Sequence, residues 1–271
     1  MIGSMMSSLP SGKRTVVALL TSSGLVLGAC GSSEPDTTEQ TLTTTIEATH
    51  PWDSTSFTQG LEATEAGDLI VGTGMYNQSR IYRTSVDGQQ ANSHELEGRL
   101  FGEGVTVHND TVWQLTWKAG IAFKRDVNTL EETGRVDYQG EGWGLCSDGS
   151  QLVMSDGSGT LTFRNPETFA VTGTVDVTRN GKKTDQLNEL DCASDGSVWA
   201  NVWQTNEIYK IDVNSGDVIA VADTTGILPA ADRPGADVLN GIAEIPGSNG
   251  QRFYITGKYW NELYEVRFQP K

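Results

Sequence analysis

The chain has 271 residues, with 35 Asp or Glu against 19 Lys or Arg, so its formal net charge is −16 at pH 7. Nucleic acids and anionic lipid surfaces are themselves negative, so this balance argues against nucleic acid as a partner and against electrostatic docking on a membrane. The length suits one domain with a sizeable core once a leader is removed.

Residues 1–29 have the pattern of an export signal. Lys13-Arg14 supplies a positive start, and residues 16–27 form a mostly apolar segment that is too short to span a bilayer. The segment ends in Leu27-Gly28-Ala29-Cys30, which resembles the bacterial lipobox, whose cysteine becomes the lipidated first residue. We therefore expect an exported lipoprotein, anchored through Cys30 to the outer face of a bacterial cell membrane. The alternative is an ordinary signal peptide followed by an incidental Cys30.

The segment after this cysteine is polar throughout. Residues 31–40 contain no apolar side chain, so they cannot contribute to a core. We expect residues 30–41 to form a disordered tether that holds the folded domain away from the membrane. The folded domain is then expected to span residues 42–271.

Five copies of one short pattern divide this domain. Their spacings of 44, 40, 45 and 52 residues indicate a repeat architecture. Each copy places a glycine, or once a glutamate, directly before an aliphatic residue. The copies are Gln59-Gly60-Leu61, Glu103-Gly104-Val105, Trp143-Gly144-Leu145, Asn188-Glu189-Leu190 and Asn240-Gly241-Ile242.

Short β-rich runs follow each copy, and no long helical periodicity occurs, which is typical of an all-β protein. A second strand is expected at residues 69–71, 112–115, 152–154, 198–202 and 253–255. A third strand, with apolar residues in alternation, is expected at 79–83, 121–125, 160–164, 207–211 and 262–266. Copies one to four have a fourth strand near residues 94–96, 135–137, 173–175 and 219–221.

The fifth copy has no fourth strand before Lys271, while a spare strand at Thr43–Ala48 precedes the first copy. Pairing of these two regions would close the repeats into a ring and remove the open edges of an extended sheet. We therefore predict a five-bladed β-propeller whose last blade is closed by the N-terminal strand. The first strands of the blades would line the central axis and converge on one mouth, where a ligand pocket is expected.

The signature segments and second strands place an unusual set of side chains at this mouth. Tryptophans beside amides and a carboxylate indicate a small-molecule pocket, whereas a purely structural axis would carry small and aliphatic residues. Tryptophan also packs between blades, which is the interpretation adopted for Trp52, Trp113 and Trp199. The predicted pocket set is Phe57, Gln59, Phe101, Glu103, Trp117, Trp143, Asn188, Trp203, Asn240 and Lys258.

Glu103 is the first candidate for proton transfer in this set. It lies between two glycines in Phe101-Gly102-Glu103-Gly104, and apolar walls around it would raise its pKa and suit it to acid–base chemistry near neutral pH. Glu141, in Gly140-Glu141-Gly142, has a similar setting and is the second candidate. For either residue the alternative is a solvated glutamate in a glycine-rich loop.

Eight motifs occur in order along residues 45–268: Phe57-Thr58-Gln59-Gly60-Leu61, Phe101-Gly102-Glu103-Gly104, Gln114-Leu115-Thr116-Trp117-Lys118, Gly142-Trp143-Gly144-Leu145, Leu187-Asn188-Glu189-Leu190, Asn201-Val202-Trp203-Gln204-Thr205, Val238-Leu239-Asn240-Gly241-Ile242 and Thr256-Gly257-Lys258. Together they resemble the plant- and bacterial-type glutaminyl cyclases, which are glutaminyl-peptide cyclotransferases. The resemblance implies a five-bladed propeller that converts an N-terminal glutamine to pyroglutamate and releases ammonia. The chain departs from the family pattern outside the pocket, at Asn77 and at Asn261-Glu262.

The resemblance also implies roles for the pocket residues. Glu103 would move a proton from the attacking α-amine to the leaving nitrogen. Gln59, Asn188 and Lys258 would complete the catalytic set, because they can orient the amide or stabilise the oxyanion. Substrate would be bound by Phe57, Phe101, Trp117, Trp143, Trp203 and Asn240. The expected substrates are peptides or exported proteins with an N-terminal glutamine, and the expected state is a monomer that meets the membrane only through its lipid.

Two other classes of protein stay open. Oxygen ligands from Glu103, Asn188 and Asn240 could hold Ca²⁺ in a lactonase-type hydrolase, which a chelator would inactivate. A surface binding module without enzymatic activity would retain ligand and produce no ammonia. The scattered His50, His94 and His108 carry no zinc signature. We expect no metal in the reaction and no required cofactor, although a structural cation such as Ca²⁺ in the axial channel also stays open.

The two remaining cysteines fall at nearly the same height on neighbouring first strands. Cys146 comes one residue after Leu145, and Cys192 comes two residues after Leu190. Because an exported domain meets an oxidising environment, we expect these two residues to form a disulfide. Two buried thiols are the alternative, and the one-residue offset must be absorbed by strand twist or a bulge.

Overall fold

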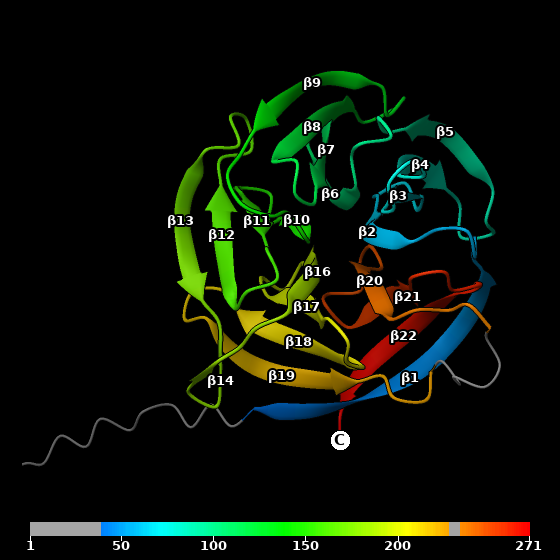
Figure 1. The fold of residues 1–271 in the computed structure, drawn as a ribbon. Coiled ribbons are helices and arrows are strands. Elements are labelled where there is room, and N and C mark those ends of the chain that lie inside the picture. The colour runs from blue at the N-terminus through cyan, green and yellow to red at the C-terminus, as the bar shows by residue number, and fades with distance from the viewer. Residues whose placement is uncertain (1–38, 228–233) are drawn as a thin grey trace, which may run out of the picture. The chain divides into compact units, whose positions relative to one another are not determined.

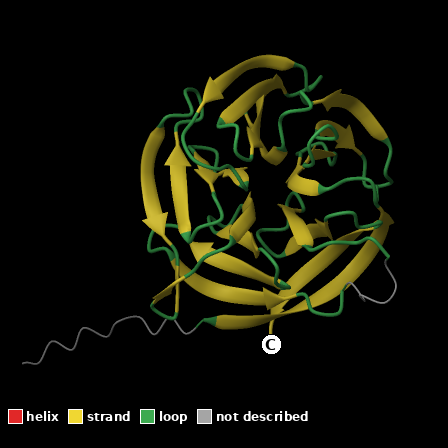
Figure 2. Ribbon diagram, in the orientation of Figure 1, coloured by secondary structure: helices red, strands yellow, loops and turns green. Residues whose placement is uncertain are grey.

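The computed structural model describes residues 39–227 and 234–271, which lie in one compact unit. Every regular element in these ranges is a β-strand (Figure 2), so the all-β prediction is confirmed, and the strands have a propeller-like arrangement. No helix within these ranges is long and apolar enough to cross a membrane. The predicted leader, Cys30 and most of the predicted tether lie outside the described residues.

Three sheets each consist of four consecutive antiparallel strands that follow one another across the sheet. The first contains β2 (Thr58–Ala63), β3 (Leu69–Thr73), β4 (Arg80–Thr84) and β5 (Gln90–Glu95). The second contains β6 (Gly102–His108), β7 (Thr111–Thr116), β8 (Ile121–Asp126) and β9 (Glu132–Asp137). The third contains β10 (Leu145–Ser147), β11 (Leu152–Met154), β12 (Thr160–Arg164) and β13 (Val171–Asp176).

The other strands belong to one larger sheet. Its order is β16 (Leu187–Cys192), β17 (Val198–Val202), β18 (Glu207–Asp212), β19 (Asp217–Asp223), β1 (Gln40–Pro51), β22 (Glu262–Pro270), β21 (Arg252–Gly257) and β20 (Leu239–Glu244). A hairpin of β14 (Thr178–Arg179) and β15 (Lys182–Lys183) pairs with β19 and was not predicted.

The N-terminal strand β1 makes the pairing that the sequence predicted for it. It runs antiparallel to β22, with Thr44 opposite Phe268, and so supplies the strand that the fifth copy lacks. It also runs parallel to β19, with Gln40 opposite Ala220 and Thr41 opposite Val221. β1 begins at Gln40, inside the range predicted as a tether, because a polar residue can still pair through its backbone groups.

The first strands of the five repeats lie together in the middle of the arrangement (Figure 1). β2 contacts β6, β6 contacts β10, β10 contacts β16, β16 contacts β20, and β20 contacts β2. The glycine of the repeat permits this approach: a Cβ on Gly60 would lie 2.5 Å from the backbone nitrogen of Val105, and one on Gly104 would lie 2.7 Å from that of Leu145. Glu189 holds the same position in the fourth copy, and its side chain is fully buried.

The hydrophobic core consists of clusters between neighbouring sheets and one cluster, around Trp199, between strands of the larger sheet. Trp52, Trp113 and Trp199 are all buried in such clusters, as the sequence interpretation had them. Trp199 stacks on Phe268 of the last strand, with ring centroids 5.0 Å apart. The outer strands β5, β9 and β13 instead consist of exposed and half-buried residues, and most of their residues are exposed. Apolar packing therefore supports the inner strands, which carry the pocket.

A covalent link joins two of these inner strands. Cys146 on β10 and Cys192 on β16 form a disulfide, with their Cα atoms 5.3 Å apart. The register shift of β16 against β17 lies between Leu187 and Leu190, and the pairing is regular from Leu190 to Cys192. No bulge therefore lies within the one-residue offset, which leaves strand twist as the way to absorb it.

Candidate active site

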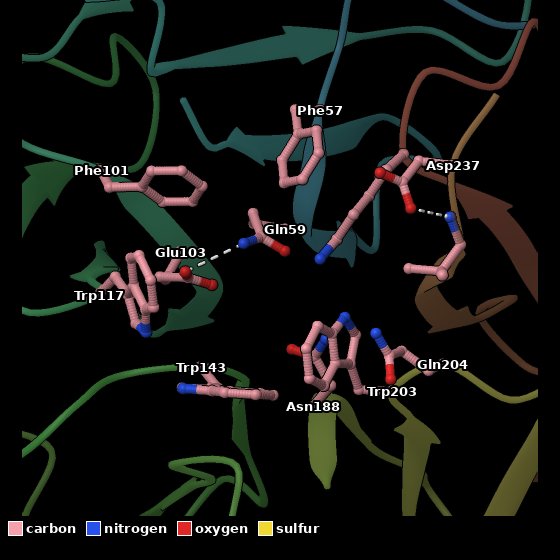
Figure 3. Close-up of a pocket in the computed structure, with 12 residues that line it drawn as sticks. Phe57, Gln59, Phe101, Glu103, Trp117, Trp143, Asn188, Trp203, Gln204 and Asp237 are labelled. Carbon is pink, nitrogen blue, oxygen red and sulfur yellow. Dashed lines mark hydrogen bonds between the residues drawn. The ribbon is translucent and has the colours of Figure 1, made fainter. Parts of the chain in front are cut away.

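A pocket opens where the first strands meet, and nine of the ten predicted pocket residues line it (Figure 3). Its volume of about 330 Å³ is sufficient for an amino-acid side chain rather than for a long segment of chain. The predicted residues at its wall are Phe57, Gln59, Phe101, Glu103, Trp117, Trp143, Asn188, Trp203 and Lys258.

A chain of hydrogen bonds crosses three first strands at the base of this pocket. Asn240 on β20 donates from Nδ2 to Oε1 of Gln59 on β2 at 3.2 Å, and Gln59 donates from Nε2 to Oε1 of Glu103 on β6 at 2.9 Å. Asn240 also donates to the backbone oxygen of Thr58 at 3.0 Å. These contacts hold the amide of Gln59 with its nitrogen towards the carboxylate.

Asn240 therefore does not lie where the sequence analysis predicted it. It was predicted to bind substrate, but it is fully buried and does not line the pocket. Its hydrogen bonds to Gln59 make it a residue that orients a pocket side chain from behind. The sequence pattern places it on a first strand correctly, but it does not say which residues of that strand lie behind their neighbours.

The carboxylate of Glu103 is enclosed by protein. Burial raises its pKa well above the usual range, and the positive charge of Lys258 and the hydrogen bond from Gln59 oppose this shift. Burial likewise lowers the pKa of Lys258, whose Nζ lies 4.7 Å from the centre of the Phe57 ring. Burial thus shifts the pKa of the acid upward and that of the base downward, a perturbation that is typical of groups used in acid–base chemistry.

Aromatic rings wall the pocket in two groups. In one group, Phe101 contacts Phe57 and Trp117 edge to face, with ring centroids 6.0 and 5.5 Å apart. In the other, Trp143 contacts Trp203 edge to face at 5.6 Å. Rings in such contacts lose little freedom on binding and exclude water from a small ligand.

Glu141, the second candidate carboxylate, does not line the pocket. Its Oε2 accepts hydrogen bonds from the indole nitrogens of Trp117 at 2.7 Å and Trp143 at 3.2 Å. Its side chain is 41% exposed and lies 3.6 Å from Nζ of Lys118. The structure thus separates the two Gly-Glu-Gly glutamates, with Glu103 in the pocket and Glu141 behind its wall.

Asn188 has an amide oxygen that protein does not satisfy. The residue is buried and lines the pocket, and Oδ1 has no hydrogen-bond partner among the described residues. A buried polar atom without a partner is costly, so its place at a pocket wall is explained if a ligand supplies the partner. Asn188 can therefore hold a polar group of a bound molecule.

Three further lining residues were missed by the sequence interpretation: Gln204, Asp237 and Val238. Gln204 directly follows Trp203, and the other two directly precede β20. Gln204 and Asp237 are exposed at this edge of the pocket, where Oδ1 of Asp237 accepts a 2.6 Å hydrogen bond from the backbone nitrogen of Val238. Gln204 and Val238 lie inside two of the eight motifs, which was a signal that the pocket set did not use, whereas Asp237 lies just outside a motif and belongs to no repeated strand.

The structure offers no ready metal centre in the part of the chain that it describes, since no three His, Cys, Asp or Glu residues cluster as ligands there. The three histidines lie apart and have separate partners. His50 contacts Glu265, His94 contacts the backbone oxygen of Thr129, and His108 contacts Ser147.

Comparisons with known proteins agree on one family. A sequence model described as glutamine cyclotransferase matches residues 18–268. A protein of Arabidopsis thaliana named glutaminyl-peptide cyclotransferase is 34% identical over 230 residues, which cover 83% of this chain and 71% of that protein. The crystal structure of Myxococcus xanthus glutaminyl cyclase superposes with a TM-score of 0.78 at 34% identity, covering 86% of this chain and all of that one.

Proposed function

The chain belongs to the glutamine cyclotransferase family, and on that premise we propose how its pocket converts an N-terminal glutamine into pyroglutamate. It is a glutaminyl-peptide cyclotransferase, an enzyme that releases ammonia from the glutamine side chain as the ring closes. The observation that carries the mechanism is the buried Glu103, held by Gln59 and facing an aromatic pocket of side-chain size.

The reaction forms one bond and breaks another within the same residue. The α-amine nitrogen attacks the γ-carboxamide carbon, the C–N bond to the amide nitrogen breaks, and one proton moves from the attacking nitrogen to the leaving nitrogen. The α-amine has a pKa of roughly 8, so much of it is close to its neutral form at working pH. The difficult steps are folding the side chain back on the amine and protonating a poor leaving group.

Glu103 is the group that moves this proton. Because burial raises its pKa, Glu103 holds a proton more readily than an exposed glutamate and can donate it to the departing nitrogen. Its other oxygen can then take the proton that the attacking nitrogen loses. A positioned acid–base group of this kind contributes roughly 10²–10⁴-fold to the rate.

Lys258, Gln59 and Asn188 stabilise the oxyanion and orient the amide. All three line the pocket, and Lys258 lies close enough to Glu103 for its charge to lower that pKa. The aromatic walls formed by Phe57, Phe101, Trp117, Trp143 and Trp203 enclose the folded side chain and exclude water, which would only hydrolyse it.

The ring that carries this pocket is a closed five-bladed propeller in our proposal. One supporting fact is the pairing of β1 with β22. The other is the contact between β20 and β2, which are the last and the first of the five inner strands, so that these strands contact one another in a ring. Closure would fix the positions of Gln59 and Glu103, which lie on the first two of these inner strands, relative to Asn240, which lies on the last.

Export and lipidation belong to the same proposal. The lipobox-like segment ending at Cys30 supports anchoring at the outer face of a bacterial membrane, where exported peptides and proteins with N-terminal glutamine would be the substrates. We propose a monomer that contacts the membrane through its lipid alone. We propose too that the reaction needs no metal, while a structural divalent cation in the axial channel stays open.

The decisive experiment incubates the purified protein with a peptide that begins with glutamine, with and without a chelator. Ammonia release and a mass loss of about 17 Da are expected in both, because intramolecular closure expels one NH₃. Activity that the chelator abolishes would point instead to a metal-dependent hydrolase. Peptide binding without mass loss would point to a binding module.

A further inference from the structure

The aromatic rings of the pocket wall form two groups, and Glu141 is hydrogen-bonded to one ring of each group. Phe101 contacts both Phe57 and Trp117 on one side, and Trp143 contacts Trp203 on the other. A single carboxylate oxygen, Oε2 of Glu141, accepts the indole N–H of Trp117 and of Trp143. Figure 3 shows the indole nitrogen of Trp117 at the end of its ring towards Trp143, and that of Trp143 at the end of its ring away from Asn188.

The backbone around Glu141 supports this connection. Gly142 donates its N–H to the carbonyl of Trp117 at 2.9 Å, and Trp143 donates its N–H to the carbonyl of Ser155 at 3.1 Å. Behind the Trp143 ring lies Gly157, where a Cβ would come within 2.5 Å of the ring. The two tryptophans are thus placed by backbone contacts, and the carboxylate sets the rotation of both side chains.

We propose that Glu141 is a positioning residue of the cyclisation reaction, which holds Trp117 and Trp143 so that the two walls close on the glutamine side chain. This rests on the proposed function and assigns Glu141 no proton transfer of its own. An indole N–H is a donor only, and a charged acceptor gives it a stronger and better-oriented hydrogen bond than water does. The ion pair with Lys118 is exposed and contributes little to this arrangement.

The chemistry of the acceptor gives a matched pair of variants. Glu141→Gln keeps an oxygen at the same reach, while Glu141→Met keeps the length and removes the acceptor. We expect Glu141→Gln to retain kcat/KM within roughly threefold and Glu141→Met to lower it roughly tenfold, because two partly buried N–H groups lose their partner. Most of this loss should appear as a higher KM, because aromatic walls that enclose the glutamine side chain bind it equally well in the ground state and in the transition state.

A mutant cycle separates positioning from a general effect on folding. In a Trp117→Phe, Trp143→Phe background both indole N–H groups are gone, so Glu141→Met should there lower kcat/KM by less than twofold, roughly the error of such measurements. The same tenfold loss in that background would overturn the proposal. Lys118 is unsuitable as a control, because its Nζ lies 4.0 Å from the centre of the Trp117 ring. Glu131→Met, at an exposed glutamate that does not line the pocket, serves as the control and should change kcat/KM by less than about twofold.

The indole N–H resonances give a readout that does not need turnover. Assigned through the Phe variants, the signals of Trp117 and Trp143 should both move in Glu141→Met and stay close to wild type in Glu141→Gln. Unmoved signals in Glu141→Met would overturn the proposal. A Glu141→Gln variant as inactive as Glu103→Gln would also overturn it, since a carboxyl proton would then be needed at position 141. If the wild type forms no pyroglutamate, the proposed function fails, and the resonances still decide the role of Glu141.

Discussion

The side-chain amide of Gln59 donates a 2.9 Å hydrogen bond to the carboxylate of Glu103, and the two residues come from neighbouring first strands 44 positions apart in the chain. The bond fixes the orientation of the carboxylate in the pocket. It also ties the acid–base group to Asn240, which orients Gln59 from the next first strand. The reactive group is therefore supported by the contact between repeats, and its environment depends on their close approach.

Glu103→Gln should abolish most cyclisation and leave the fold intact. The amide has nearly the same shape but cannot exchange a proton, so a loss of roughly 10²–10⁴-fold in kcat is expected. Ammonia release from a glutamine peptide measures the activity, and circular dichroism with thermal melting checks the fold. Near wild-type turnover would show that another group transfers the proton.

Asn188→Ala and Asn240→Ala should fail in different ways. Asn188 lines the pocket, and its side-chain oxygen has no partner among the residues that the structure describes, so its loss should lower kcat/KM by roughly 10²-fold with little change in melting temperature. Asn240 is buried behind Gln59, so its loss should lower the melting temperature as well as the activity. Steady-state kinetics and melting curves of the two variants test the distinction. Identical behaviour in both measurements would contradict it.

The disulfide between Cys146 and Cys192 should stabilise the domain without taking part in the reaction. The cysteines are 46 residues apart, and a loop of that size corresponds to roughly 4 kcal/mol on the chain-entropy estimate. Reduction, or the Cys146→Ser, Cys192→Ser variant, should lower the melting temperature and leave kcat unchanged below it. Thiol titration under denaturing, non-reducing conditions should find neither cysteine free. Two free thiols would show that the bridge does not form.

Glu189 should make the protein less stable as pH rises. It is fully buried, and burial raises its pKa well above the ordinary value of 4.5. The folded state therefore keeps a proton that the unfolded state releases, so stability is greatest below pH 4.5 and falls, as pH rises towards the folded pKa, by at most about 1.4 kcal/mol per pH unit from this group.

Melting temperatures of wild type and Glu189→Gln between pH 5 and about pH 9 measure this contribution, since the amide cannot titrate. The curve of the variant should be flatter. Glu189 also accepts a 2.8 Å hydrogen bond from the backbone nitrogen of Leu61, which glutamine can preserve through its oxygen. Parallel curves for the two proteins would assign the pH dependence to other groups.

Cys30→Ser should release the protein from the membrane. If the lipobox-like segment directs lipidation, the wild type will fractionate with membranes and the variant will be soluble or retained as an uncleaved precursor. Fractionation of cells followed by immunoblotting separates these cases. A wild type that is already soluble would indicate simple signal-peptide cleavage, and a membrane-bound, processed variant would indicate another anchor.

Much of the fold follows from local features of the sequence. The repeated glycine before an aliphatic residue predicted where the first strands lie, because only a residue without a side chain permits the approach seen at Gly60 and Gly104. The spare N-terminal strand predicted the pairing with β22. The β14–β15 hairpin and the extension of β1 to Gln40 were not predicted, because short polar strands carry no hydrophobic alternation.

The candidate site, like the fold, was predicted in part from local sequence and in part only from the tertiary structure. By itself the sequence determined which side chains reach the pocket, since the motifs fall at fixed positions of the repeat, and nine of the ten predicted residues line it. Glu103 and Glu141 have the same Gly-Glu-Gly neighbours, and only the tertiary structure decided that one is buried beside Gln59 and the other binds two indoles from outside. It also decided that Asn240 lies behind Gln59 and that Asp237 reaches the edge of the pocket. The physical reason is that local pattern specifies strand and turn, while burial, pKa and hydrogen-bond partners depend on side chains that neighbouring repeats contribute.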